Sequence, residues 1–435
     1  MMKLIIDRTR YLGIFCLFLL LVFPISSGAD DFHFNNFPIG ERPSGLAGAY
    51  TALSNDATGL YYNPAGIVGI NQVTASIYAY AKSTSEYKNV FGNTSWTKDT
   101  GEFVPGFFGF THTLFKGTLG FSVAVIDSGH SDQNQDIYNI NYNGQKIWDY
   151  GRINYNFDNK VYNFGPSFAL PISEEFSLGT TLYLHYKKQK EFQNQVFSSG
   201  GGSTFSLLWE NMRIEETEWG IRPILGILWK PKNQKVSVGL SVSRTFLFSR
   251  DYSNQYLGTY QSVTPSNPQI QTLADLEKSS DFQEYPFVAT LGIAYAFSPR
   301  WLLSWDLSYY TKTERQDDNE VPSTFSTRSF FNTAIGGEFR YSEKWIFRAG
   351  FFTNLANNNI DDSTVNQRAE SVDMVGFNLS ATFKQKSNSY TLGTSYSTGT
   401  GKAQLGEFGF GENRFTSNPV DVQNSLWIIF FSASF

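Results

Sequence analysis

The stretch "WLLSWDLSYY" at residues 301–310 shows most clearly which kind of fold this chain adopts. Its odd positions carry Trp, Leu, Trp, Leu and Tyr, whereas Ser304, Asp306 and Ser308 stand between them. Successive side chains of a strand point to opposite faces, so this alternation predicts a β-strand with one apolar and one polar face. Residues 235–243 and 373–383 alternate in the same way. A soluble β-sandwich would also alternate, so single strands do not decide the fold.

The spacing of the polar breaks favours a membrane barrel over a sandwich. Short breaks lie between pairs of strand-like runs at 115–117, 171–175, 230–234, 298–300, 342–344 and 384–388. Long polar stretches lie between these hairpins at 128–160, 193–218, 249–284, 312–328, 355–371 and 399–424. Short turns that alternate with long loops are typical of the periplasmic and extracellular ends of outer-membrane barrels. Structureless loops of this length are unusual in a compact soluble domain.

The runs between the breaks predict an all-β chain with a transmembrane antiparallel β-barrel of about fourteen strands. The expected strands lie near 72–81, 104–115, 118–127, 161–170, 175–187, 219–229, 235–247, 286–297, 301–311, 329–341, 345–354, 372–383, 389–398 and 425–435. An even number brings both ends of a closed barrel to the same side of the membrane.

Composition agrees with this class. Aromatic residues make up 17% of the chain and charged residues also 17%, against roughly 25% charged residues in a typical soluble domain. After the N-terminus no apolar run approaches the 18 or so residues of a membrane-spanning helix. An exported, aromatic-rich chain without such helices indicates a barrel in the outer membrane.

The first 29 residues predict a cleaved secretory signal peptide. Lys3, Arg8 and Arg10 precede an apolar run at residues 12–23, and small residues end at Ala29. A membrane anchor is the alternative, but the run is well short of about 20 residues. The one cysteine, Cys16, lies inside the run, so we expect neither a lipoprotein nor disulfides in the mature chain. Removal takes three basic residues and one acidic residue, so the net charge goes from −5 to −5 − 2 = −7, and no basic patch suggests nucleic-acid binding.

Residues 30–71 precede the first strand and show no alternation. The stretch 43–56 predicts a short helix, and 57–66 predicts a tight turn in which Asn63 precedes Pro64. A fourteen-stranded barrel is too wide for wall side chains alone to fill, so it either conducts water or carries a plug. We therefore expect residues 30–71 to form an N-terminal hatch inside a barrel of residues 72–435.

The run "AGAYTALSNDATGLYYNPAGI" at 47–67 resembles the hatch signature of the outer-membrane long-chain fatty acid transporters of the FadL/TodX type. The resemblance implies fourteen strands, an N-terminal hatch that contains Asn63, Pro64, Ala65 and Gly66, and a C-terminal Phe. It also implies hydrophobic ligands that enter from outside, bind in the barrel and leave laterally beside a kinked strand. Barrels for protein secretion or surface attachment carry a similar segment, and this alternative stays open.

Charged residues on lumen faces are the next candidates. Alternation points Arg222, Asp306, Glu338 and Arg348 inward, and reflection of the hairpin about its turn places Glu338 opposite Arg348 as an ion pair. This pair has a structural role as its simplest explanation. Lys187 and Arg222 have no evident partner in the sequence, so they are our candidates for a ligand carboxylate.

Apolar lumen residues suggest a hydrophobic ligand. In the last strand Leu426, Ile428 and Phe430 are expected to face the interior, and Phe352 to join them. A water-filled porin would place polar groups there, although packing against the hatch or a loop explains the residues equally well. Aromatic residues of the hatch that could reach the same space are Phe32, Phe34 and Phe37.

The sequence predicts no enzyme. The four histidines are not paired at a metal-ligand spacing, and no nucleophile motif, metal site or cofactor site is expected. The expected partners are hydrophobic small molecules such as fatty acids, outer-membrane lipid, and the barrel assembly machinery, which would read the terminal Phe435. We expect a monomer in the outer membrane, with no nucleic acid bound.

Overall fold

The structure is a computed structural model that describes most of the chain after the N-terminal region. The described residues are 39–91, 94–142, 145–201, 203–232, 235–264, 268–281, 284–313, 327–357, 369–404, 407–408, 415–416 and 419–435. The expected signal peptide and Phe32, Phe34 and Phe37 lie outside these residues. Among the described residues, no helix is long and apolar enough to cross a membrane.

Eighteen strands are assigned in the described part of the chain. They are β1 (Gln72–Phe91), β2 (Thr94–Leu114), β3 (Gly117–Tyr142), β4 (Gln145–Pro171), β5 (Phe176–Gly201), β6 (Thr204–Trp229), β7 (Val236–Ser243), β8 (Phe246–Val263), β9 (Gln269–Ser279), β10 (Val288–Ala296), β11 (Trp301–Tyr310), β12 (Phe330–Arg340), β13 (Trp345–Asn354), β14 (Ala369–Gln385), β15 (Asn388–Gln404), β16 (Glu407–Phe408), β17 (Phe415–Thr416) and β18 (Val420–Ser434).

Fourteen of these strands close into an antiparallel barrel. The ring runs β1-β2-β3-β4-β5-β6-β7-β10-β11-β12-β13-β14-β15-β18, and β18 pairs with β1 to close it. Every expected strand therefore has its counterpart, and the predicted fourteen-stranded antiparallel barrel is confirmed. Closure removes the unpaired backbone edges, which a strand in hydrocarbon could not leave unsatisfied.

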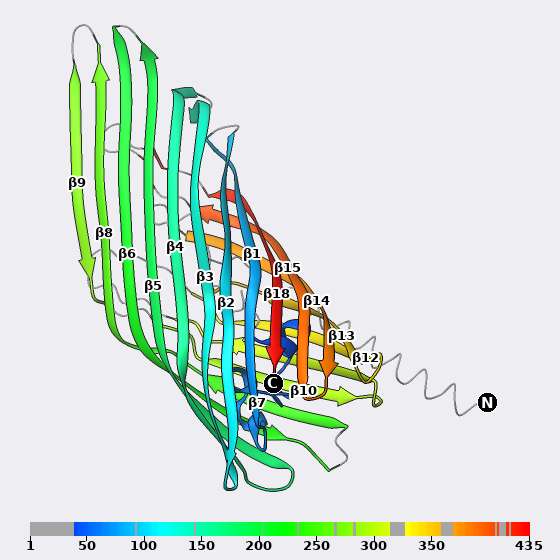
Figure 1. The fold of residues 1–435 in the computed structure, drawn as a ribbon. Coiled ribbons are helices and arrows are strands. Elements are labelled where there is room, and N and C mark those ends of the chain that lie inside the picture. The colour runs from blue at the N-terminus through cyan, green and yellow to red at the C-terminus, as the bar shows by residue number, and fades with distance from the viewer. Residues whose placement is uncertain are drawn as a thin grey trace.

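The long polar stretches on one side of the barrel are not loops, which corrects the sequence prediction. Residues 128–160 and 193–218 belong largely to β3–β6, and most of 249–284 forms β8 and β9. β5 and β6 pair without a break from Phe176 and Trp229 up to Gly201 and Thr204. Figure 1 shows these strands as a tall wall that rises beyond the shorter strands β10–β13. Polar outer faces tolerate water there, so the ladder continues beyond the apolar belt.

The inner face of the tall wall has its own apolar core. Trp96, Trp148, Tyr155 and Phe197 of the wall pack with Met374 of β14 in one buried cluster. These positions alternate with polar outer ones, as Tyr155 does with Asn154 and Asn156. Burial of large aromatic side chains is a strong stabilising contribution, and it explains why stretches of polar average composition still form ordered strands.

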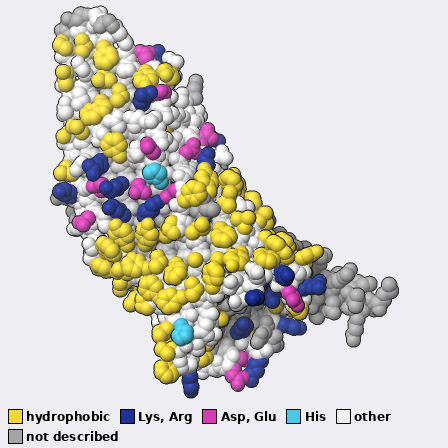
Figure 2. Space-filling view, in the orientation of Figure 1, with side chains coloured by type: hydrophobic (Ala, Val, Ile, Leu, Met, Phe, Trp, Pro, Cys, Tyr) yellow, Lys and Arg dark blue, Asp and Glu magenta, His cyan; other side chains and the backbone are white. Residues whose placement is uncertain are grey.

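A belt of exposed apolar side chains surrounds the barrel below the tall wall. Figure 2 shows this band, with charged side chains gathered above and below it. On adjacent strands the outer side chains of Tyr162, Tyr186 and Trp219 form a row: the ring centroids are 6.4 Å apart for the two tyrosines and 4.5 Å apart for Tyr186 and Trp219. Such aromatic girdles lie at membrane–water interfaces, so this row marks the upper border of the belt.

Before β1, the described residues 39–71 contain three short helices and turns: α2 (Glu41–Gly45), α3 (Gly59–Tyr62) and the 3-10 helix η1 (Pro64–Ile67). The predicted helix over 43–56 is wrong, because α2 ends at Gly45. Ala47 and Gly48 then adopt positive φ angles of 55° and 89°, which no right-handed helix accommodates. The expected turn at 57–66 also contains α3 and the start of η1.

Candidate functional site

Residues 39–71 lie inside the lower part of the barrel (Figure 1) and make hydrogen bonds to several strands of its inner wall. The Ser44 carbonyl accepts a hydrogen bond from Asn378 of β14, and the backbone of Tyr50 and Thr51 donates to Asp306 of β11. Further along, the Asn63 side chain donates to β6. We call residues 39–71 the inner segment. It therefore crosses the lumen along much of the barrel's inner circumference.

Glycines on the barrel wall make room for the inner segment. A Cβ atom added to Gly226 of β6 would lie 2.0 Å from Asn63 Oδ1, and one on Gly239 of β7 would lie 2.2 Å from the Thr51 carbonyl oxygen. The same close approach to inner-segment atoms recurs at Gly179, Gly292, Gly336 and Gly350. Because no L side chain fits at such distances, the wall is shaped for a backbone that lies directly against it.

Asn63 is a buried fastening point. Its amide nitrogen donates to the carbonyl oxygens of Thr51, at 2.9 Å, and of Ile227, at 3.0 Å, while its side-chain oxygen accepts from the amide of Ala65. One side chain thus begins η1, closes the inner segment on itself and ties it to β6. This geometry gives the motif "NPAG" a positional role. Pro64 starts η1, and a Cβ atom added to Gly66 would lie only 2.4 Å from the Ser54 carbonyl oxygen, so no larger residue fits there.

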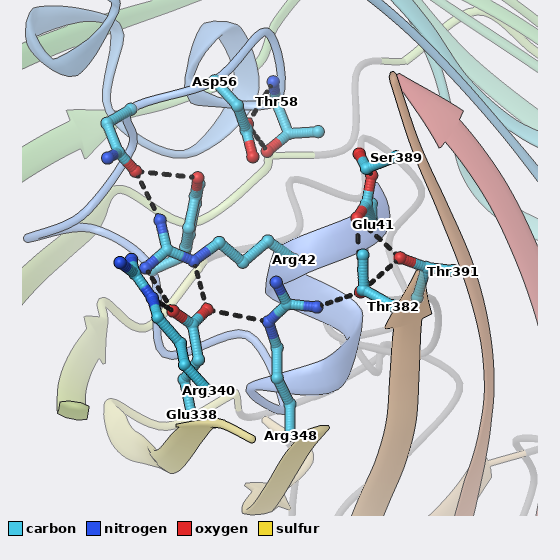
Figure 3. A network of polar contacts seen from close by, with 12 residues as sticks. Glu41, Arg42, Asp56, Thr58, Glu338, Arg340, Arg348, Thr382, Ser389 and Thr391 are labelled. Carbon is cyan, nitrogen blue, oxygen red and sulfur yellow. Dashed lines mark hydrogen bonds and ion pairs between the residues drawn. The ribbon is translucent and has the colours of Figure 1, made fainter. Parts of the chain in front are cut away.

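A buried ion network joins the inner segment to β12 and β13 (Figure 3). Glu338 Oε2 accepts from Arg42 Nε at 2.8 Å and from Arg348 Nε at 2.9 Å. Glu338 and Arg348 are opposite each other in the sheet register, so the cross-strand pair predicted from the sequence is confirmed. What the sequence did not reveal is the third member, Arg42, which turns a wall pair into a fastening point for the inner segment.

Glu41 forms a second anchor beside this network (Figure 3). Its carboxylate accepts hydrogen bonds from Thr391, Ser389 and Ser434 at 2.6, 3.0 and 3.0 Å, and from Thr382 at 3.3 Å. Arg348 donates to the same Thr382 hydroxyl. Four hydroxyls can satisfy a buried carboxylate, and here they come from β14, β15 and β18.

Burial also changes the acidity of inner-segment groups. It raises the pKa of Asp56, although hydrogen bonds from Thr58 oppose the rise. For Arg42, burial alone would lower the pKa, but the nearby acidic groups, Glu338 first among them, together outweigh burial and raise the pKa, so the guanidinium stays charged. The fastening of Arg42 to the wall therefore persists over the whole ordinary pH range.

Apolar side chains of β18 line the interior above the inner segment. Ile428 and Phe430 are 1% and 2% exposed and pack with Val104 and Val125, and Leu426 is partly buried against them. All three thus face inward, as expected from alternation. Phe352 is also buried but lies against Gly376 of β14, and it is not part of this cluster.

Lys187 and Arg222, the two expected free cations, have different environments. Lys187 Nζ lies 2.5 Å from Glu216 Oε2, so the expectation that Lys187 lacks a partner is wrong. Glu216 and Glu218 share Arg250 as well, and Tyr285 donates to Glu218. The sequence did not reveal this because Glu216 lay in a stretch interpreted as a loop.

Arg222 stands apart from that network. Its guanidinium lies over the ring of Tyr61, 5.3 Å from the centroid, and its Nε is buried without a hydrogen-bond partner. A rotated Asn163 amide would accept from its NH1 group at 3.3 Å. Arg222 is half-buried, faces Tyr61 of the inner segment and makes no ion pair among the described residues, which leaves a cation able to meet an anion in the lumen.

The wall is interrupted between β2 and β3. Their backbone pairing runs upward from Leu114 and Gly117 and ends at Phe107 and Ala124. Above the gap, Ser131 and two glutamine side chains bond to β2 backbone in place of a ladder. We call the gap, residues 100–106 of β2 and 125–130 of β3, the window. Bulges at β1 and β3 accompany it. The dipeptide "PG" at 105–106 was not singled out from the sequence, although Pro and Gly within a strand mark bulges.

The window lies between the apolar interior and the outer face of the wall. Val104 and Val125 border it within the cluster of Phe430. On the outer side Phe103 is 79% exposed, and its ring lies 6.3 Å from that of Tyr80, which in turn lies 6.2 Å from Trp427. These three aromatics form a second outer row beside the window, which is typical of a membrane interface. Within the described residues, no group of three His, Cys, Asp or Glu side chains could hold a metal ion.

Comparison with known proteins supports the fold. No protein-family profile and no curated protein matches the chain. A FadL homologue from Pseudomonas aeruginosa is 14% identical over 93% of this chain and 99% of its own, with a TM-score of 0.58. The toluene transporters TodX of P. putida (12%, TM-score 0.56) and TbuX of Ralstonia pickettii (14%, 0.55) each match over 92% of this chain and 98% of theirs. The chain thus has the barrel fold of these proteins, and the resemblance inferred from 47–67 holds for the fold.

Proposed function

We propose that this chain is an outer-membrane protein that lets hydrophobic small molecules pass without an energy source. The observation that carries the proposal is the window, which joins an apolar interior to the lipid-facing side at girdle height. The structural neighbours support it, because their names describe a FadL homologue and two toluene transporters. A polar aqueous pore would have neither an apolar interior nor an exit toward lipid.

A ligand would move along this route by transfer between apolar surroundings. Each buried methylene group contributes about 0.8 kcal/mol, so a chain-like ligand gains stability beside Ile428 and Phe430. It then leaves through the window into the membrane without crossing water. The inner segment closes the lumen below, so we propose that it acts as the hatch and directs ligands sideways.

We further propose long-chain fatty acids as the substrates. Lys187 and Arg250 balance the two carboxylates of Glu216 and Glu218. Arg222 lies outside that network, and its unpaired Nε is suited to a ligand carboxylate. Toluene-like hydrocarbons would use the apolar route without this contact, and no catalytic role is proposed.

The second candidate is a barrel for protein secretion or surface attachment. The observation in its favour is the tall wall, whose outermost strand β9 pairs only with β8 among the described strands and exposes Ile270 and Leu276. A protein partner could add to such an edge.

Extraction of the purified barrel followed by mass spectrometry tests the proposal. We expect co-purified fatty acid in wild-type protein and its loss in Phe430→Asp. Arg222→Gln should weaken oleate binding without weakening toluene binding. Arg213→Gln, an exposed arginine of the same strand, is the matched control and should bind oleate normally. An empty lumen together with a stable co-purifying protein would favour the second candidate.

A further inference from the structure

We propose that Glu102 and Lys160 form a latch through the window and that this latch limits how far β2 and β3 separate. Lys160 of β4 forms an ion pair with Glu102 of β2, and its Nζ also donates to Ser128 of β3 at 2.8 Å. One side chain thus reaches across β3 to a strand with which β4 does not pair. Its proposed effect on ligand passage rests on the proposed function, whereas its effect on the gap does not.

The two members of the latch start from opposite faces of the wall. Glu102 is opposite Ala81 of β1, which is buried with Val104 in the interior cluster, so Glu102 starts from the inner face. Lys160 has the parity of Tyr162, the girdle residue on the outer face of β4. Side chains alternate along each strand. The ion pair therefore passes through the wall at the window, where no backbone ladder stands in its way.

The latch lies between two firmer connections. Below it, backbone pairs join β2 and β3 from Phe107 and Ala124 downward. Above it, Gln133 and Gln135 bond to the backbone of Ser95 and Thr97 and so replace a ladder by side chains. Over residues 100–106 neither connection is present. The width of the window at girdle height therefore depends on the ion pair.

The ion pair of the latch is weak enough to break and re-form. The side chains of Glu102 and Lys160 are 13% and 30% exposed, so water screens the pair only in part. Only Oε2 of Glu102 has a partner, because Oε1 is buried without a hydrogen bond. Partly exposed ion pairs are weak compared with a run of backbone hydrogen bonds. Such a pair can part and re-form as a bulky ligand passes, which a ladder cannot do.

The charged side chains beside Lys160 on β4 and β5 do not offer Glu102 a substitute partner. Asp158 lies 3.9 Å from Lys160 and competes for it rather than for Glu102. Lys188 is directly opposite Lys160 on β5, but it lies a further strand away from β2. Loss of either latch residue should therefore free the edge of β2 rather than shift it to another anchor.

Spin labels on both sides of the window measure the separation directly. The labels replace Phe103 on β2 and His130 on β3, both exposed, in a chain with Cys16→Ser. In Glu102→Gln and in Lys160→Met, we expect a broader distribution with longer distances, and a return toward wild type in the charge swap Glu102→Lys with Lys160→Glu. A second label pair at Asp158 and Lys190, opposite each other on the intact β4–β5 ladder, should not change.

Glu215→Gln is the matched control for the loss of an ion pair. It removes the Lys190–Glu215 contact of 3.2 Å across the continuous β5–β6 ladder, and it should leave the window labels unchanged. If Glu102→Gln fails to fold, wild-type protein in high salt serves instead, because salt weakens a partly exposed pair. Unchanged distances at the window under all these conditions would overturn the latch.

Uptake into proteoliposomes separates the latch from the proposed function. We expect oleate uptake to rise about threefold to fivefold in Glu102→Gln and Lys160→Met, the factor set by a weak ion pair, and not in Glu215→Gln. Longer distances with no uptake of oleate or toluene by any variant would retain the latch and refute the transport proposal. If wild type takes up the ligand and neither variant alters uptake or the distances, the latch is refuted and the transport proposal is retained.

Discussion

Replacement of Glu338 by Gln should loosen the inner segment while the barrel stays intact. Glu338 Oε2 holds Arg42 of the segment and Arg348 of the wall together. Glutamine keeps the shape of the side chain but removes its charge, so two buried guanidinium groups lose their common counter-ion. Their mutual repulsion then favours a state in which Arg42 leaves the wall for water.

The expected cost follows from burial. The side chains of Glu338 and Arg348 are 2% and 3% exposed and that of Arg42 is 13% exposed. Breaking a buried pair by removal of one partner costs about 3–5 kcal/mol. If this cost falls on the docked state of the inner segment, amide protons of residues 39–71 should exchange about a hundredfold to a few thousandfold faster.

Hydrogen exchange followed by mass spectrometry measures the exchange rate of residues 39–71 separately from that of the barrel strands. Exchange in β3–β6 should stay slow, since Glu338 contacts none of these strands. Glu343→Gln, an exposed acidic residue in the turn after β12, is the control and should leave exchange unchanged. Unaltered exchange of residues 39–71 in Glu338→Gln would refute the idea that this ion network fastens the segment.

Further outcomes are expected from changes at the segment and the lumen. Asn63→Ala removes three hydrogen bonds and should cost about 2–4 kcal/mol of segment docking, seen as faster exchange of residues 39–71; wild-type exchange would contradict it. Gly226→Ala adds a Cβ where Asn63 Oδ1 lies at 2.0 Å, and should cost about 1–3 kcal/mol by the same measurement, whereas Gly201→Ala, which meets no atom within 4 Å, should not. Deletion of residues 39–71 should raise ion conductance in planar bilayers, and equal conductance would mean that the segment does not obstruct the lumen. Phe430→Asp should abolish oleate binding measured by calorimetry, while heat-dependent gel mobility shows that the barrel still folds.

Local patterns predicted the barrel well because they arise from local geometry. Alternation fixed the inward face of Asp306, Ile428 and Phe430, and one hairpin turn sufficed to place Glu338 opposite Arg348. Each of these inferences uses a period of two and a neighbour in sequence, so no distant part of the chain can upset it.

The errors occurred where distant partners decide. The strands of the tall wall have polar outer faces, and their shared core with β14 and β18 stabilises them. Lys187 was expected to be free because its partner Glu216, on the neighbouring strand β6, lay in a stretch that was interpreted as a loop. Likewise, the window depends on where the β2–β3 register fails, and "PG" alone does not say which neighbour is lost.

The path of the inner segment has a consequence for how the barrel is made. Its contacts begin with Glu41 on β14, β15 and β18 and proceed backward through β11 and β6 to Gly69 on β3. A segment that contacts strands on successive sides of the barrel matches one circumference of the sheet. In a barrel with one hairpin more or fewer, Asp306, Gly226 and Glu338 would no longer lie opposite their partners in the inner segment. The contacts of the inner segment therefore stabilise only a barrel that has the correct number of strands and is closed by β1 on β18.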